Sequence, residues 1–437
     1  MSTGGGQNME RRIDVPTSKK RAMSTNADDE REAAYRNLGT ETITCQAQNG
    51  RRSSHDDNYS PLDLLPSNCP VVVHRPAAAL LLPSAAAAAA GKVFSGPGNM
   101  RLRRGPPLVK MALAVLATVL ASMAPAVPRG RCNDAARAVV ARSIFVNRKG
   151  GTDFTSVQDA VDSVPFGNGQ WIRVHVAAGV YNEKVMIPQN KSFILLEGEG
   201  WQQTSIEWAD HAGGDSSTAA SPTFAAYSAD FMARDITFKN TYNGAGNIAP
   251  AVAALVAGDR SSFYRCGFVS VQDTLSDIEG RHYYEGCYIE GAMDFIFGNG
   301  QSIFQGCEIW TARTPVWPGF ITAQGRMSEA DSSGFVFKGC TVRGVTPAYL
   351  GRAWRRYARV IFYQTDMSGV VVSQGWDAWS YKGTEGTLTM VEEGCTGQGS
   401  NRTGRVPWTK DLSGDDLAKF VDLSYVSADG WLDAEPR

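Results

Sequence analysis

Short apolar runs separated by turns fill the chain from about residue 143 to its end. The runs at 171–176 and 231–238 are examples, rich in Val, Ile, Phe and Met. Runs of roughly four to eight such residues, bounded by turn residues, are typical of β-strands. The pattern therefore predicts one all-β domain over 143–437. Helical spacing of apolar residues predicts two helices, at 157–162 and 414–420.

An irregular repeat of about 20 residues runs through this domain. Its units read F-Y-R-C at 263–266, Y-E-G-C at 284–287, F-Q-G-C at 304–307 and F-K-G-C at 337–340. Such a period is the length of one coil of a parallel β-helix, and no hairpin signals join the strands. The sequence therefore predicts a parallel β-helix in which the cysteines stack along the axis.

The stacked cysteines leave two interpretations open. They are buried free thiols in a core ladder. Alternatively they pair between coils as Cys266–Cys287 and Cys307–Cys340, which a secretory route would permit.

The first 107 residues lack the strand pattern and are rich in Ser, Asn and Arg pairs, as disordered extensions are. Within 108–126 a basic residue precedes a short apolar run, which is followed by small residues that resemble a cleavage site. This arrangement is typical of a secretory signal peptide. Two interpretations stay open. Translation starts at Met100 or Met111 and the upstream part is a mis-assigned leader, or 108–126 is an internal signal anchor.

Charge and metal-ligand residues exclude several classes of function. The net charge is −1, with 43 Lys and Arg against 44 Asp and Glu, so no global field favours nucleic acid. The five histidines and eight cysteines show no zinc-ligand spacing, which argues against a metal site.

Two lone carboxylates stand out among the predicted strands. Asp294 lies in the apolar run 291–298, and Asp273 precedes it by 21 residues. That is about one coil, so the two can lie side by side, some 4.8 Å apart. Arg352, from a later coil, can hold one acid ionised while the other keeps its proton. The pattern predicts a nucleophile and an acid/base; Gln272 beside Asp273 points away unless the strand bends there.

Five motifs together resemble those of the plant pectin methylesterase (pectinesterase) family. They are G-V-Y-N-E at 179–183, Q-D-T-L at 272–275, G-A-M-D-F-I-F-G at 291–298, I-T-A-Q-G-R at 321–326 and L-G-R-A-W at 350–354. They occur in the family's order, and the resemblance covers about 143–437.

The resemblance implies a right-handed parallel β-helix that hydrolyses the methyl esters of galacturonate in pectin (homogalacturonan), releasing methanol and pectate. Asp294 would attack the ester carbonyl and form an acyl-enzyme, with Asp273 as general acid and then base. Gln272 would donate to the oxyanion. Arg352 would orient Asp294, keep it ionised and border the substrate. No metal and no cofactor is implied.

The resemblance also suggests aromatic contacts to the sugar. Tyr181, Phe297, Trp354 and Trp376 are candidates, because aromatic faces suit pyranose rings. The alternative for each of them is packing in the core.

Location and partners follow from the same resemblance. The resemblance implies a secreted, glycosylated enzyme of the cell wall that acts on pectin as a monomer. Proteinaceous pectinesterase inhibitors are possible protein partners under this resemblance, and binding of nucleic acid is not implied. Two N-glycosylation sequons, at 190–192 and 401–403, are compatible with secretion.

The chain departs from the family pattern at Pro250. The family usually carries a second oxyanion-supporting glutamine there, and proline lacks even a backbone N–H. A catalytically weakened pectin-binding homologue is therefore an alternative function. A glycoside hydrolase or lyase that uses Asp273 and Asp294 on the same scaffold is another.

Overall fold

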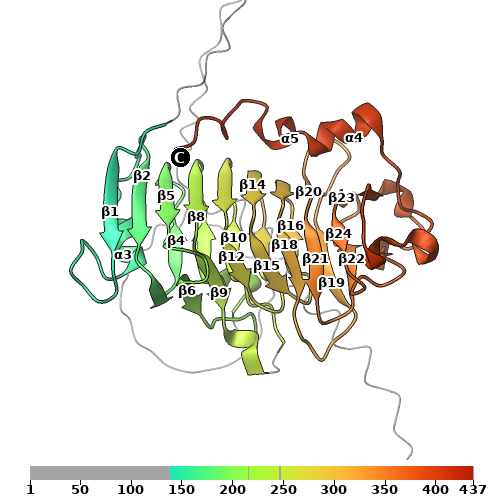
Figure 1. Cartoon of the computed structure of the whole chain (residues 1–437), viewed down its shortest axis with the longest axis horizontal. Helices are drawn as coiled ribbons and strands as arrows, with labels where there is room; N and C mark the ends of the chain where they lie inside the picture. The colour runs from blue at the N-terminus through green and yellow to red at the C-terminus, as the bar shows by residue number, and fades with distance from the viewer. Residues whose placement is uncertain (1–137, 215, 246–247, 437) are drawn as a thin grey trace, which may run out of the picture. The chain divides into compact units, whose positions relative to one another are not determined.

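The computed structural model describes residues 138–214, 216–245 and 248–436. The predictions made for 1–107 and 108–126 lie outside these residues. Figure 1 shows short strands stacked side by side from β1 (teal) to the orange strands near the other end. The chain passes in turn through three sheets, named here A, B and C, and every strand pair is parallel. The predicted parallel β-helix is confirmed.

The strands are short, and each sheet takes one strand from nearly every coil. Sheet A has, in spatial order, β1 (Arg142–Val146), β2 (Ile172–Val176), β5 (Ile194–Glu197), β8 (Phe231–Arg234), β11 (Ser261–Tyr264), β14 (Arg281–Glu285), β17 (Gln301–Gln305), β20 (Gly334–Lys338), β23 (Arg359–Tyr363) and β26 (Thr389–Glu393). Sheet B has β3 (Gly179–Asn182), β6 (Thr204–Trp208), β9 (Thr237–Asn240), β12 (Gly267–Val269), β15 (Tyr288–Gly291), β18 (Glu308–Thr311), β21 (Thr341–Gly344) and β24 (Asp366–Met367). Sheet C has β4 (Val185–Ile187), β7 (Phe224–Ala226), β10 (Ala254–Val256), β13 (Leu275–Asp277), β16 (Ile296–Gly298), β19 (Gly319–Gln324), β22 (Ala348–Ala353) and β25 (Trp376–Asp377).

Both predicted helices are present. Helix α3 (Val157–Asp162) begins at Ser156, whose hydroxyl accepts from the backbone N–H of Asp159. Helix α4 (Gly414–Val421) is followed by α5 (Ser424–Ser427), and both run along one end of the sheet A strands in Figure 1. The short 3-10 helices are η1 (Thr218–Ala220), η2 (Tyr242–Ala245), η3 (Trp379–Tyr381), η4 (Glu385–Thr387), η5 (Gln398–Ser400) and η6 (Arg402–Gly404). Among the described helices, none is long and apolar enough to cross a membrane.

A ladder of aromatic rings explains the repeat. Phe263, Tyr284, Phe304, Phe337 and Phe362 occupy one register position in successive strands of sheet A. Neighbouring rings stack with centroids 4.5–5.0 Å apart and with interplanar angles of 7–10°. Each ring is buried, so the stack contributes both apolar burial and ring–ring attraction to the core.

The residue before each repeated cysteine lies in the left-handed region. Arg265 has φ of 51°, and Gly286, Gly306 and Gly339 have φ near 60°, which glycine adopts without the strain of a Cβ. This residue turns the chain from sheet A to sheet B. The glycine-cysteine pairs of the sequence are therefore turn signals of the coil.

The cysteines that follow these turns are free thiols. This holds for Cys266, Cys287, Cys307 and Cys340, which are buried, and for the half-buried Cys395. Of the two interpretations, the core ladder of thiols is the one found, and neither predicted disulfide is present. The small side chain fits the tight turn position, so its repetition needs no covalent bond.

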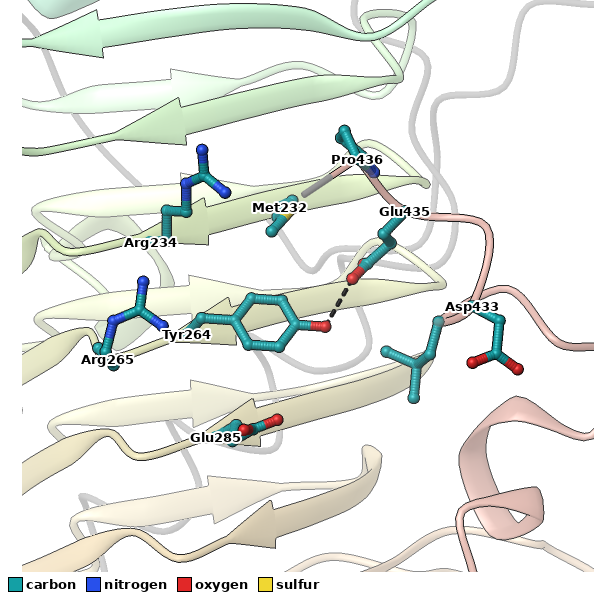
Figure 2. Close-up of a pocket in the computed structure, with 9 residues that line it drawn as sticks. Met232, Arg234, Tyr264, Arg265, Glu285, Asp433, Glu435 and Pro436 are labelled. Atoms are coloured by element: carbon teal, nitrogen blue, oxygen red, sulfur yellow. Dashed lines mark hydrogen bonds between the residues drawn. The ribbon is translucent and has the colours of Figure 1, made fainter. Parts of the chain in front are cut away.

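The segment after α5 closes over the outer face of sheet A. A cavity of about 350 Å³ lies beneath it. Figure 2 shows the side chains of Glu435 and Tyr264 at this cavity, where the tyrosine hydroxyl donates to Glu435 at 2.6 Å. The hydroxyl of Ser262 donates to the other oxygen of Glu435 at 2.5 Å. These two bonds fasten the carboxyl-terminal segment to β11.

Candidate active site

Asp273 and Asp294 lie on adjacent coils at the junction between sheets B and C. Gln272 pairs with Met293 in a parallel bridge, and the N–H of Asp273 donates to the carbonyl of Met293 at 3.0 Å. The register places Asp273 beside Asp294, since Leu275 pairs with Ile296 two residues later. Both carboxylates are fully buried.

Both aspartates have a left-handed backbone, with φ of 62° at Asp273 and 47° at Asp294. Non-glycine residues seldom adopt this conformation, because their Cβ crowds the neighbouring carbonyl. It bends the chain from sheet B to sheet C at these two residues. The bend that would re-aim the side chains near Gln272 is therefore present.

The glycines that bracket Asp294 are required by close packing. A Cβ on Gly291 would lie 2.2 Å from the Cβ of Phe295, and a Cβ on Gly298 would lie 1.9 Å from the carbonyl oxygen of Asp277. Gly298 also has φ of 126°, which side chains rarely tolerate. The two glycines let β15 and β16 approach their neighbours and so fix the position of Asp294 between them.

Arg352 forms a two-pronged pair with Asp294. Its Nε donates to one carboxylate oxygen at 2.8 Å, and its Nη2 donates to the other. Arg352 stands on β22, two strands from β16 in sheet C. Bidentate arginine–carboxylate pairs fix orientation and favour the ionised acid. The geometry therefore places an oriented carboxylate in a buried position.

Two aromatic rings hold the guanidinium of Arg352. Its central carbon lies 4.0 Å from the ring centroid of Trp379 and 4.9 Å from that of Phe320. Phe320 in turn stacks on Tyr349 at 5.1 Å. Cation–π contacts of this kind strengthen as water is excluded. The arginine is thus fixed from several sides before any ligand arrives.

An apolar face lies beside the acids on the outer side of sheet C. The residues of this face align from coil to coil as Ala225, Leu255, Ser276, Phe297 and Ala323. The next residue in the row is Arg352, since Ala323 pairs with it. The row therefore leads from an apolar floor directly to the arginine that binds Asp294.

Phe297 and Trp354 belong to this face. Their rings meet edge to face with centroids 6.1 Å apart, and both side chains are largely covered. They are packed outside the main core, in a cluster with Ala225, Leu255 and Ala323. The structure therefore brings these two predicted aromatics to the vicinity of the acids.

Tyr181 and Trp376 are corrections to the predicted sugar-binding set. The hydroxyl of Tyr181 donates to the carbonyl of Ala177 at 2.9 Å, and its ring is buried in the core. Trp376 is 1% exposed, and its indole N–H donates to Glu392 at 3.0 Å. Both side chains point into the coil, where sequence alone could not distinguish an aromatic of the core from one of a cleft.

Pro250 lies next to the strand of Gln272. The N–H of Ala251 donates to the carbonyl of Gln272 at 3.1 Å, and the carbonyl of Pro250 accepts from the N–H of Ala212 at 2.7 Å. Gln272 itself is half-buried. A longer polar side chain at position 250 would therefore start one coil away from Gln272, and proline supplies no donor in that place.

Trp317 is an exposed aromatic residue that the motifs did not reveal. It is 68% exposed, beside Val316 at 48%. The loop that carries both joins β18 to β19 on the coil after Asp294, where the N–H of Ala312 donates to the carbonyl of Gly291 at 2.8 Å. Its only sequence signal is a large apolar pair inside a loop between predicted strands.

Among the described residues, no group of three or more His, Cys, Asp or Glu side chains could hold a metal ion.

The family model described as Pectinesterase matches residues 143–429. A relative from Arabidopsis thaliana described as probable pectinesterase 29 is 46% identical over 308 residues, which are 68% of this chain and 91% of the relative. Probable pectinesterase 55 of the same plant is 46% identical over 303 residues, 67% and 91% of the two chains.

Solved structures agree with this result. Pectin methylesterase from carrot matches with a TM-score of 0.65 and 32% identity, over 69% of this chain and 98% of that one. The Aspergillus niger enzyme matches with a TM-score of 0.60 and 27% identity, over the same shares. Pectin methylesterases are right-handed parallel β-helices, and the three parallel sheets described above have this architecture.

Proposed function

Because this chain belongs to the pectinesterase family, whose members are carboxylic ester hydrolases, we propose that it removes methyl groups from pectin through an aspartyl acyl-enzyme. The family and the fold support hydrolysis of pectin methyl esters. The observation that carries the mechanism is the buried Arg352–Asp294 pair, with Asp273 on the adjacent coil. This arrangement places the oriented carboxylate of Asp294 next to a second acid, Asp273.

The first half-reaction forms the acyl-enzyme. A carboxylate oxygen of Asp294 attacks the C6 carbonyl carbon of a methyl galacturonate residue. The bond from that carbon to the methoxy oxygen breaks, and Asp273 gives its proton to the departing oxygen to form methanol. Burial beside an ion-paired carboxylate favours the protonated form of Asp273 before this step. A mixed anhydride between Asp294 and galacturonate remains.

The second half-reaction releases the acid. Asp273, now ionised, accepts a proton from water, and the hydroxyl oxygen attacks the galacturonate carbonyl. The anhydride bond to Asp294 breaks, which restores its carboxylate and leaves a free galacturonate. Arg352 holds Asp294 in one orientation throughout, as positioning groups do in nucleophilic catalysis.

Gln272 is assigned to the oxyanion that develops in both steps. Its place beside Asp273 supports this role, and one donor of this kind is typically worth about 10²–10³ in rate. Pro250 removes the second donor that the family usually has. This specific observation favours an alternative function, a pectin-binding homologue with weak catalysis, which the same assay can identify.

Substrate contacts are assigned to the outer face of sheet C. The apolar row that ends at Arg352 suits the apolar faces of pyranose rings, with Phe297 and Trp354 packed along it. Trp317 adds an exposed indole on the coil that follows Asp294. A polysaccharide that follows this row would pass directly over the acids.

The setting that goes with this function is the plant cell wall. We assign the chain to secretion, with glycosylation at the sequons 190–192 and 401–403. Pectin is its polymer partner, proteinaceous pectinesterase inhibitors are candidate protein partners, and the active unit is a monomer.

Methanol release tests this function directly. The full chain is incubated with highly esterified pectin, and methanol, reducing ends and unsaturated products are measured together. The proposal predicts that methanol is released with no new chain ends, and that Asp294→Asn lowers the rate of its release by about 10³-fold or more. New reducing ends or unsaturated products without methanol would instead support a hydrolase or a lyase, and pectin binding without any product would support the weakened homologue.

A further inference from the structure

We propose that a cavity at the ends of β6 and β9 is an outlying site for a sugar ring of the same polysaccharide. This inference rests on the proposed function and extends it to a second binding position. The cavity measures about 280 Å³ and is lined by Asn182, Glu207, Trp208, Ala209, Asp210 and Thr241. Of these residues, Asn182 alone belongs to the motifs that resemble those of the family.

The register places this cavity on the same edge as the acids. Trp208 pairs with Asn240 in sheet B, and the next strand, β12, leads within four residues to Asp273. All three strands turn toward sheet C at this edge. Trp208 therefore lies two coils before Asp273, about 10 Å along the axis at the spacing of neighbouring strands. Asp273 also lies three residues further along its chain than the position aligned with Trp208, which adds about 10 Å in the strand direction.

Firmly held loops border the cavity. The loops that follow β6 and β9 carry His211 and Tyr242, whose rings stack with centroids 3.6 Å apart and an interplanar angle of 4°. The carbonyl of Trp208 accepts from both the N–H and the hydroxyl of Thr241, at 2.7 and 3.1 Å. The amide of Asn240 donates to the carbonyl of Asp210 at 2.8 Å. The cavity is thus preformed.

The charges around the cavity are balanced. Lys184 lies 2.7 Å from a carboxylate oxygen of Asp210, and Lys239 lies 3.7 Å from Glu207. A site selective for anionic galacturonate would present basic groups in excess of acidic ones, as arginine and lysine sites for anions do. This lining instead fits a ligand recognised by its hydroxyl groups, for which carboxylates and an amide are good partners.

The indole of Trp208 supplies the apolar part of such a site. It is 38% exposed at the end of its strand, with polar side chains beside it. Small-molecule sites commonly combine an apolar surface with a few placed polar groups. The geometry therefore points to a sugar ring that stacks on Trp208 and donates its hydroxyls to Glu207 and Asp210, whether or not its C6 carboxyl is esterified.

Substrate length separates this site from the catalytic one. Long esterified oligogalacturonides reach both sites, whereas a trimer does not. Trp208→Ala should raise KM for the long substrate about three- to tenfold, the value of one aromatic contact, with kcat unchanged. KM for the trimer should not change. Trp208→Tyr should restore most of the affinity for the long substrate.

Phe166→Ala is the matched control, since Phe166 is an exposed aromatic (71%) in the loop before β2.

Calorimetric binding of the same long oligomer gives a readout that does not need turnover. An equal affinity of the wild type and of Trp208→Ala would overturn the outlying site and leave the proposed function intact. A wild type that binds the oligomer through Trp208 but releases no methanol would overturn the proposed function and leave the site standing. A loss of affinity that appears only with de-esterified oligomers would also contradict the inference, because it would mean recognition of the carboxylate.

Discussion

Arg352 binds both oxygens of Asp294 from a strand two positions away in sheet C. The pair is enclosed by Trp379 and Phe320. A buried ion pair is a weak source of net stability, but it becomes costly when one partner is removed. The pair therefore serves orientation and charge at Asp294, and this gives it testable consequences for both activity and folding.

Replacing Arg352 should impair both properties. Arg352→Gln leaves a buried carboxylate without its cation, so we expect the free energy of unfolding to fall by about 3–5 kcal/mol. Methanol release should fall by about 10²-fold or more, and Arg352→Lys should recover only part of it, because lysine lacks the planar fork. Denaturant unfolding and initial rates measure the two effects.

Arg265→Gln is the control for this variant. Arg265 also pairs with an aspartate through two nitrogens, but it is mostly exposed. Exposed pairs contribute about 0–1 kcal/mol, so both stability and rate should stay near the wild type. An Arg352→Gln protein as active as Arg265→Gln would contradict the assigned role.

Pro250→Gln should raise turnover. The substitution places an amide donor on the coil before Gln272, where the family usually has one, and a recovered oxyanion donor is worth up to about 10²–10³ in rate. The carbonyl that accepts from Ala212 remains available. Values of kcat on esterified pectin compare the two proteins. Equal values would mean that the lost donor is replaced by another group.

Trp317→Ala should weaken binding of short and long substrates alike. Its loop follows Asp294 by one coil, so every productive complex passes it, in contrast to Trp208. We expect KM to rise about three- to tenfold with kcat little changed. Initial rates on a trimer and on a long oligomer measure this. A change confined to the long oligomer would place Trp317 away from the catalytic subsite.

The carboxyl-terminal segment should loosen as the pH rises. Burial raises the pKa of Glu435 to about 7 from its ordinary value of 4.5, against the hydrogen bonds of Ser262 and Tyr264 and with the help of the nearby Asp230. Between these two pH values the unfolded chain gives up the proton that the folded chain keeps. Stability should therefore fall by about 3 kcal/mol from pH 4.5 to 7 and then level off.

Glu435→Gln isolates this effect. The amide cannot ionise, so the pH dependence attributable to this residue should disappear from thermal unfolding curves between pH 4.5 and 7. Arg234, Arg265, Glu285 and Asp433 also border the cavity (Figure 2). If the variant keeps the full pH dependence of the wild type, the pH dependence does not come from Glu435.

Much of this fold was predictable because its repeat is local. One aromatic and one cysteine per coil are enough to reveal the period, and the structure explains them as the ring stack through Tyr284 and the turn before Cys287. The pairing of the cysteines could not be derived in the same way. Equal spacing along the axis is compatible with a thiol ladder and with disulfides.

The site was only partly predictable. Asp273, Asp294 and Arg352 were singled out because charged residues inside apolar strands are costly and so informative, and the structure brings them together. Trp376 was wrongly expected in a cleft, because an aromatic residue looks the same in sequence on either face of a strand. Trp317 was missed because a loop length does not reveal what the loop exposes, and Trp208 because an aromatic residue at the end of a strand carries no signal of exposure.

The central claim is that Asp294 is the nucleophile and acts as a unit with Asp273. The most direct measurement is the rate of methanol release by Asp294→Asn, Asp273→Asn and the double variant, on one esterified pectin, with folding checked for each. The account predicts that each single change lowers kcat by about 10³-fold or more and that the double change costs little further, because groups that act together are not additive. An Asp294→Asn protein that releases methanol within tenfold of the wild-type rate would contradict it.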